Sequence, residues 1–167
     1  VTTDNVPVKN ENGKSFFVNP NESLKIQLEK SNLLGKLNRT VKNLIELLKQ
    51  SEHKNDPNVK KLFTNWSGFI EELASTEKKN VFAYNVNKGE SISICLMNKK
   101  TNKMNGYNEL LHVILHELAH VMTEEYKHDH KFWKHFEFLR NFAKDNNIYE
   151  KIDYGSNPVS FCNSYLQ

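Results

Sequence analysis

The stretch Leu110–Trp133, LLHVILHELAHVMTEEYKHDHKFW, holds five of the seven histidines in the chain. Its first half is almost wholly apolar, which predicts a buried helix from about Tyr107 to Glu125. In that helix His116, Glu117 and His120 form the pattern His-Glu-x-x-His. Histidines four positions apart lie on one face of a helix, so both imidazoles can reach a single ion about 2 Å from each nitrogen.

Glu117 lies on the same rim of this helix as the two histidines. A carboxylate there can accept a proton from a water molecule that a metal activates, which is the general-base role in metal-assisted peptide hydrolysis. Burial of two imidazoles and a carboxylate in so apolar a helix costs several kcal/mol unless a partner satisfies them. The pattern therefore predicts a metal site, and Zn²⁺ is the ion expected for this motif.

A catalytic zinc has three protein ligands as a rule, and four residues after the second histidine are candidates for the third. Glu124 and Glu125 are displaced along the helix axis, and we interpret them as solvated charges at the helix end. His128 and His130 follow a turn, where the chain can fold back under the metal. The residues alone leave the choice between these two histidines open.

Other polar aromatic side chains have weaker claims to a role. His112 lies one turn before His116 and could support the site from behind, but we favour a core histidine. His135 and His53 receive no role. Tyr154 could donate its hydroxyl to an oxyanion, although a tyrosine in the C-terminal tail more often packs.

The rest of the chain predicts an α+β fold in one domain over residues 1–167. We expect a polar arm over 1–21, a helical part over 22–75 and a catalytic part over 80–167, with an irregular tail from Ile148. The predicted elements are a strand at Ser15–Val18, helices at Glu22–Gln50 with a weak point at Gly35, at Pro57–Ala74 and at Lys131–Asn146, and a hairpin of Val81–Val86 with Ser91–Met97.

The second strand of that hairpin, Ser91–Met97, has the sequence SISICLM and alternates polar with apolar residues. Alternation suits a strand with one wet face, at the edge of a sheet. An edge strand can pair with an extended protein substrate, so Ser91–Met97 is a candidate substrate-binding strand. The alternative is that it is merely half of a hairpin.

Composition narrows the function only slightly. The formal charge is +3 with 38% hydrophobic residues, which is ordinary for a soluble globular protein. The abundant lysines are scattered, which points to an AT-rich genome more than to a nucleic-acid surface. Cys95 and Cys162 are too few for a disulfide scaffold, so we expect two reduced thiols. Alternatively, one thiolate could take the fourth position on zinc and hold the protein latent.

HELAHV, residues 116–121, followed by HDHKFW, residues 128–133, resembles the active-site stretch of the WLM zinc metalloproteases, relatives of the SprT-type proteases. In that family the third ligand begins a pattern of His, Asp or Gly, two variable residues and Phe. The resemblance implies that His128 is the third ligand, with His130 as the alternative, and that Phe132 packs beneath the site. It also implies a zincin-like core with a small antiparallel sheet, an active-site helix and additional N-terminal helices.

The resemblance further implies a zinc-dependent endopeptidase acting on proteins crosslinked to DNA or linked to SUMO or ubiquitin. The alternatives are a processing protease for particular proteins, such as those of a virus, without DNA, and a metal-stabilised binding module without turnover. Because ligating histidines must be neutral, we expect activity and metal retention to fall below about pH 6. We expect no membrane contact and a location in the nucleus or cytoplasm, although an N-terminal anchor could have been removed.

Overall fold

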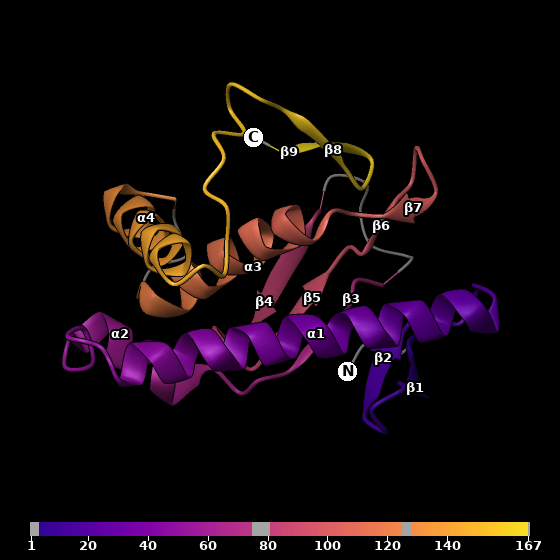
Figure 1. The fold of residues 1–167 in the computed structure, drawn as a ribbon, viewed down its shortest axis with the longest axis horizontal. Coiled ribbons are helices and arrows are strands. Elements are labelled where there is room, and N and C mark those ends of the chain that lie inside the picture. Colours follow the sequence, from indigo (N-terminus) through magenta and orange to yellow (C-terminus); the bar gives the residue numbers. More distant parts are fainter. Residues whose placement is uncertain (1–3, 75–80, 125–127, 167) are drawn as a thin grey trace.

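The computed structural model describes residues 4–74, 81–124 and 128–166. Within these ranges the chain is a mixed α+β fold, as predicted, and none of its helices is both long and apolar enough to span a membrane (Figure 1). The helices are α1 (Leu24–Lys49), α2 (Pro57–Asn65), α3 (Tyr107–Met122) and α4 (His130–Asp145). The strands are β1 (Val6–Lys9), β2 (Ser15–Val18), β3 (Ile70–Glu72), β4 (Ala83–Val86), β5 (Ser91–Ile94), β6 (Met97–Asn98), β7 (Lys103–Met104), β8 (Val159–Phe161) and β9 (Ser164–Leu166).

Helix α1 runs unbroken through Gly35, where the sequence predicted a weak point. The hydroxyl of Ser23 accepts a hydrogen bond from the main-chain N–H of Ile26 and so caps the start of the helix. Gly35 has a packing role, because a Cβ atom there would lie 2.7 Å from the side-chain nitrogen of Asn10. The absence of a side chain therefore lets the N-terminal hairpin approach α1 closely.

Helix α2 ends at Asn65, and its predicted continuation to Ala74 is wrong. Trp66 leaves the helical conformation with a ψ of 118°, and Gly68 has a φ of +86°, which favours glycine. The chain then enters β3, Ile70–Glu72, which pairs in parallel with β5. Pairing with a strand distant in sequence overrides the local helical spacing of the apolar residues.

Strand β5 lies at the centre of a three-stranded sheet with the order β3-β5-β4. Its pairing with β4 is antiparallel, as the hairpin predicted, but β3 makes the sheet mixed rather than antiparallel. All four residues of β5 are buried, including Ser91 and Ser93. The prediction of an edge strand over Ser91–Met97 is therefore wrong, because alternating serines are small enough to be buried in a central strand. Among the described residues, β3 and β4 are the two edge strands of this sheet, and each leaves its outer edge without a strand partner.

Both ends of the chain contain hairpins that the sequence pattern did not reveal. Ser15–Val18 is a strand as predicted, and Val6–Lys9 pairs with it, so the arm packs more extensively than expected. The tail beyond Ile148 is not wholly irregular, because β8 and β9 form an antiparallel hairpin. Strands of three residues are too short to carry a periodic signal. Figure 1 shows the C-terminal hairpin on the far side of α3 from the long helix α1.

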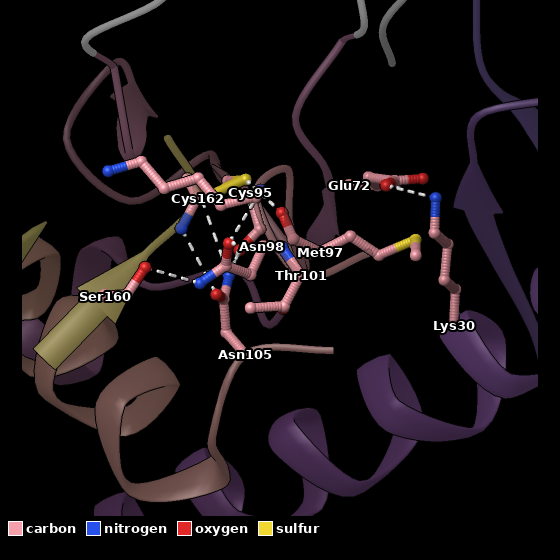
Figure 2. The surroundings of a disulfide bond; sticks show 10 residues. Lys30, Glu72, Cys95, Met97, Asn98, Thr101, Asn105, Ser160 and Cys162 are labelled. Carbon is pink, nitrogen blue, oxygen red and sulfur yellow. Dashed lines mark hydrogen bonds and ion pairs between the residues drawn. A yellow bond between two sulfur atoms is a disulfide. The ribbon is translucent and has the colours of Figure 1, made fainter. Parts of the chain in front are cut away.

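A buried ion pair joins α1 to the sheet. The ammonium of Lys30 lies 2.6 Å from the carboxylate of Glu72, and both side chains are at most 5% exposed (Figure 2). The main-chain N–H of Asn19 also donates to the Glu72 carboxylate, at 2.7 Å. Burial raises the pKa of Glu72, and the Lys30 charge opposes this rise. Each charge thus depends on the other, because either one alone would be stranded in the interior.

Cys95 and Cys162 form a disulfide, with their Cα atoms 6.3 Å apart (Figure 2). The prediction of two reduced thiols is therefore wrong, and so is the latent state in which one thiolate binds zinc. The error has a physical source, since the partners are 67 residues apart and only the fold brings them together. Disulfides persist in oxidising surroundings and are rare in the nucleus and cytoplasm. The nuclear or cytoplasmic location therefore stays a prediction, and this disulfide argues against it.

Candidate metal centre

Helix α3 carries the motif through the interior, and eleven of its sixteen residues are buried. It ends at Met122, earlier than the predicted Glu125, because Thr123 has an extended backbone and its hydroxyl donates to the carbonyl of Ala119. Glu124 is exposed and pairs with Lys61 at 3.1 Å, as expected for a solvated charge. Glu125 lies outside the described residues.

His116, His120 and His128 bring their imidazoles together, and we refer to them as the histidine cluster. The Nε2 atom of His128 lies 3.0 Å from that of His120 and 3.2 Å from that of His116. One ligand atom from each residue lies within 4.8 Å of the other two. His130, the other candidate, is exposed at the first position of α4 and is not part of this group.

Asp129 and Phe132 hold the third histidine in this position. The carboxylate of Asp129 accepts hydrogen bonds from the N–H groups of Lys131 and Phe132, which starts α4 directly after His128. The Phe132 ring is fully buried and lies 4.3 to 4.8 Å from each imidazole of the cluster. An apolar floor thus supports the three nitrogen ligands from below.

The histidine cluster fits a tetrahedral metal ion. Two nitrogens that each bind zinc at about 2.0–2.1 Å lie about 3.3 Å apart. The Nε2 separations of 3.0 and 3.2 Å in the cluster are close to this value. Burial lowers the pKa of His116 to about 3 and that of His120 to about 4, and the neighbouring imidazoles add to both shifts. Neutral imidazole is the form that binds a metal. Nδ1 of His120 is buried and has no hydrogen-bond partner among the described residues. A hydrogen bond to this nitrogen would orient the imidazole as a metal ligand.

Glu117 lies beside the cluster, with Oε2 4.0 Å from Nε2 of His116. The side-chain amide of Asn85 on β4 donates to Oε1 of Glu117 at 2.9 Å and to its main-chain carbonyl at 2.8 Å. Burial raises the pKa of Glu117 to about 7, and the Asn85 hydrogen bond opposes the rise. A carboxyl group with this pKa can both accept and release a proton near neutral pH.

Asn85 is the contact that sequence reasoning missed. A signal was available, because asparagine is depleted in strands and Asn85 falls within the predicted strand Val81–Val86. The sequence does not tell which way the Asn85 side chain points. The register of β4 against β5 and the packing of α3 decide which face of the strand carries this side chain.

His112 and Tyr154 belong to the packed interior behind the cluster. Nδ1 of His112 is hydrogen-bonded to the Tyr149 hydroxyl at 2.7 Å, and burial lowers the pKa of His112 to about 4. The Tyr154 hydroxyl donates to Glu109 at 2.6 Å and accepts from Asn108, so it is engaged in anchoring the tail to α3 rather than in meeting an oxyanion. Tyr154 thus packs against the fold, whereas the choice between a core role and a supporting role for His112 stays a prediction.

The two remaining histidines lie apart from the cluster. Nδ1 of His135 is hydrogen-bonded to the Thr123 hydroxyl, and His53 packs against the ring of Phe138. Neither contact reaches the cluster, in agreement with the absence of a predicted role.

A cleft of about 630 Å³ opens onto the cluster and onto Glu117. It is lined by His112, His116, Glu117 and His128 together with Val81, Phe82, Ala83, Val113, Trp133, Phe136, Ser164, Tyr165 and Leu166. The residues come from α3, α4, the start of β4 and the C-terminal hairpin. A polypeptide could therefore reach the histidines from solvent.

A mixed sheet beside a helix that carries His-Glu-x-x-His, with a third histidine contributed from beyond that helix, defines a zincin-type metalloprotease fold. The chain belongs to the WLM domain family, whose model matches residues 40–154. The N-terminal hairpin, the first half of α1 and the hairpin β8–β9 lie outside the matched range.

Relatives of the chain include viral proteins. It is 31% identical over 159 residues to the uncharacterized protein R325 of Acanthamoeba polyphaga mimivirus, covering 89% of this chain and 75% of the relative. It is 35% identical over 71 residues to the uncharacterized protein 136R of Invertebrate iridescent virus 6, covering 41% of this chain and only 39% of that relative.

Similar solved structures include two Wss1 proteins. Wss1 from Saccharomyces cerevisiae aligns with a TM-score of 0.40 and 21% identity over 47% of this chain and 62% of the yeast chain. A Wss1 mutant from S. pombe aligns with a TM-score of 0.40 and 22% identity over 63% of this chain and 82% of the other.

Proposed function

We propose that the chain is a zinc-dependent endopeptidase in which His116, His120 and His128 hold the metal and Glu117 moves protons. The observation that carries this proposal is the convergence of three imidazole nitrogens on one point beside a buried carboxylate, at the floor of an open cleft. Imidazole ligands from His-Glu-x-x-His plus one further residue are the set that catalytic zinc uses.

A zinc ion held by the three histidines would supply Lewis-acid chemistry, because it would lower the pKa of water and polarise a carbonyl group. The chain supplies the rest. Glu117 takes a proton from the attacking water and passes it to the amine of the departing product, so its carboxyl group changes state twice in each turnover. Asn85 keeps that carboxylate aimed at the cluster and stabilises its charged form.

The substrate backbone binds along β4 rather than along Ser91–Met97. Ala83 of β4 lies in the lining of the cleft, and Asn85 of the same strand contacts Glu117. The open edge of β4 offers main-chain hydrogen bonds to an extended peptide, and such bonds are independent of side-chain identity. An unfolded or extended protein segment is therefore the substrate class that this site favours.

Zinc content and cleavage of an unfolded protein, measured on the same samples, test the proposal. The wild-type chain is expected to hold one zinc and to cleave. Glu117→Gln is expected to keep the zinc and lose about 100-fold or more in rate, because it removes the proton carrier. Glu124→Gln, an exposed carboxylate at the end of α3, is the matched control and should behave as wild type.

Two results would overturn the proposal. If the chain binds no zinc, the proposed metal site is wrong. If wild type and Glu117→Gln cleave equally well, the proposed role of Glu117 is wrong. Zinc binding without cleavage of any substrate would instead support the metal-stabilised binding module.

A DNA-stimulated protease is a second candidate, favoured by a hollow of about 360 Å³ beyond the end of α3. Lys61, Lys131 and Lys134 line it together with Glu124, which pairs with Lys61. The ammonium groups of Lys131 and Lys134 can attract phosphates. Single-stranded DNA should then accelerate cleavage in the wild type but not in Lys131→Ala with Lys134→Ala. Lys42→Ala, exposed on α1, is the control. Cleavage that is indifferent to DNA would favour a processing protease.

A further inference from the structure

Four large apolar side chains are exposed among the described residues, and two of them lie in the cleft. Trp133 on α4 is 52% exposed, and Tyr165 on β9 is 51% exposed. The other two, Leu24 and Leu28, lie on the first turns of α1, away from the cleft. Exposed aromatic side chains that share a cleft with reactive groups mark a surface that binds a partner.

Each of these two aromatic side chains is held in place. The indole N–H of Trp133 donates to the main-chain carbonyl of His128 at 3.1 Å, so the only polar atom of the ring already has a partner. The ammonium of Lys100 lies 4.6 Å from the ring centroid of Tyr165, which covers one face of that ring. The surfaces that remain for a ligand are apolar and preformed.

The hairpin β8–β9, which carries Tyr165, is fastened to the rest of the fold at its turn. The disulfide between Cys95 and Cys162 ties the turn to the residue directly after β5. The main-chain carbonyl of Cys162 accepts from the N–H of Lys99 at 2.7 Å, and the Asn98 amide donates to the Ser160 hydroxyl at 2.8 Å (Figure 2). The hairpin is therefore a fixed wall of the cleft.

Both strands of the hairpin are packed as well. Phe161 is fully buried, its ring lies 5.1 Å from that of Phe82, and Leu166 is 4% exposed. The hairpin lies outside residues 40–154, the range that the family model matches.

The lining of the cleft offers few charged groups to a substrate. None of the described residues that line it is Lys, Arg or Asp, and the single carboxylate among them, Glu117, is already engaged by Asn85. A basic substrate side chain would find no free carboxylate there, and an acidic one would meet only the Lys100 ammonium that already lies over Tyr165. A charged side chain would therefore lose its water for little gain. A large apolar side chain would instead replace water on the aromatic walls.

We propose that the hairpin β8–β9 is a specificity wall, and that a large apolar side chain of the substrate, aromatic or long aliphatic, binds between Tyr165 and Trp133 next to the scissile bond. This inference rests on the proposed peptidase function. Backbone pairing with β4 would accept many sequences, and the aromatic slot would then select the cleavage position.

Matched peptides that differ at one position beside the scissile bond test the selection. With Phe or Leu at that position, kcat/KM of the wild type should exceed that with Ala, Lys or Asp by about 30-fold or more. In Tyr165→Ser the ratio should fall below about 5-fold with zinc content unchanged. Leu24→Ser, which changes an exposed leucine outside the cleft, is the control and should keep the wild-type ratio. Removing the disulfide with Cys95→Ser and Cys162→Ser should lower the ratio in the same direction as Tyr165→Ser.

A binding measurement separates this inference from the peptidase function. In Glu117→Gln with Trp66→Phe, Trp133 is the only tryptophan, and its fluorescence should change with a Phe peptide and not with an Asp peptide. Equal fluorescence responses, or a wild-type ratio that Tyr165→Ser leaves intact, would overturn the specificity wall. Selective binding without cleavage of any peptide would overturn the peptidase function and leave the wall standing.

Discussion

The amide of Asn85 on β4 bridges the main-chain carbonyl and the carboxylate of Glu117 on α3, at 2.8 and 2.9 Å. One side chain thereby couples the strand proposed to bind substrate to the group proposed to move protons. A peptide that pairs with β4 would lie against the same strand that orients the carboxylate. If the proposed function holds, this contact would link substrate binding to proton transfer.

Asn85→Ala removes a hydrogen bond that favours the charged form of Glu117, so the pKa of Glu117, already raised to about 7 by burial, should rise further. Because the ionised carboxylate accepts the proton, the acidic limb of the kcat/KM profile should move to higher pH, and the rate near neutral pH should fall by about 10-fold or more. Rate profiles between about pH 5 and pH 9 measure this. Asn141→Ala, an exposed asparagine on α4, controls for the loss of an amide. An unmoved limb would mean that Asn85 does not act on Glu117.

His128→Ala and His130→Ala differ in one respect, since only His128 joins the histidine cluster. Loss of a direct ligand should weaken zinc binding by more than the 10–100-fold that loss of a supporting contact costs. His130→Ala should leave zinc affinity unchanged, because that side chain is exposed at the start of α4. Competition with a chelator, followed by metal analysis, measures both affinities. The reverse ranking would make His130 the third ligand.

Acidification should destabilise the metal-free protein partly through His112. Its pKa is lowered to about 4 in the fold and is near 6.5 when unfolded, so the unfolded chain binds the proton more tightly. The stability from neutral His112 is fully present above about pH 6.5 and is lost as the pH falls toward 4, which amounts to about 2 kcal/mol near pH 5. Chemical unfolding of wild type and His112→Gln at several pH values measures the contribution of His112. The free energy of unfolding should fall less steeply with decreasing pH in the variant than in the wild type. Parallel declines would mean that the imidazole titrates normally.

The disulfide should contribute to stability without affecting the metal. Closing a loop across 67 residues restricts the unfolded chain, with an upper value of about 4 kcal/mol in the chain-entropy treatment. Cys95→Ser with Cys162→Ser should therefore lower the free energy of unfolding, and a dithiol reductant should lower that of the wild type to the same extent. Zinc content should stay constant, because no cysteine lies in the histidine cluster of the described residues. A drop in zinc content would show that the cysteines contribute to zinc binding.

Lys30→Met should destabilise the fold by about 3–5 kcal/mol, because it strands the buried charge of Glu72. Adding Glu72→Gln should recover a large part of this loss, since both charges are then gone. Lys42→Met, an exposed lysine on the same helix, should cost little. Denaturant unfolding of these variants gives the coupling. If Lys30→Met and Lys42→Met change the free energy of unfolding equally, the ion pair of Lys30 with Glu72 does not contribute to stability.

Local patterns were sufficient where the chemistry lies within a few residues. His116, Glu117 and His120 share one helical face by their spacing, and α1, α3 and α4 follow from helical periodicity to within a few residues at each end. Predictions failed where a partner distant in sequence decided the outcome. β3 was placed in a helix, β5 at an edge, and the two cysteines apart, and each error concerns a contact across at least twenty or so residues.

Helices α1, α3 and α4, the α+β class and the His-Glu-x-x-His pattern could be predicted from local spacing, because residues four apart on a single helix put two imidazoles on one face. Tertiary structure decided that His128 rather than His130 joins them, that Asn85 meets Glu117, and that a disulfide-bound hairpin carries Tyr165 to the cleft. These relationships depend on how separate elements pack against each other. Packing is set by burial and hydrogen bonding summed over the whole chain, and no local pattern contains that sum.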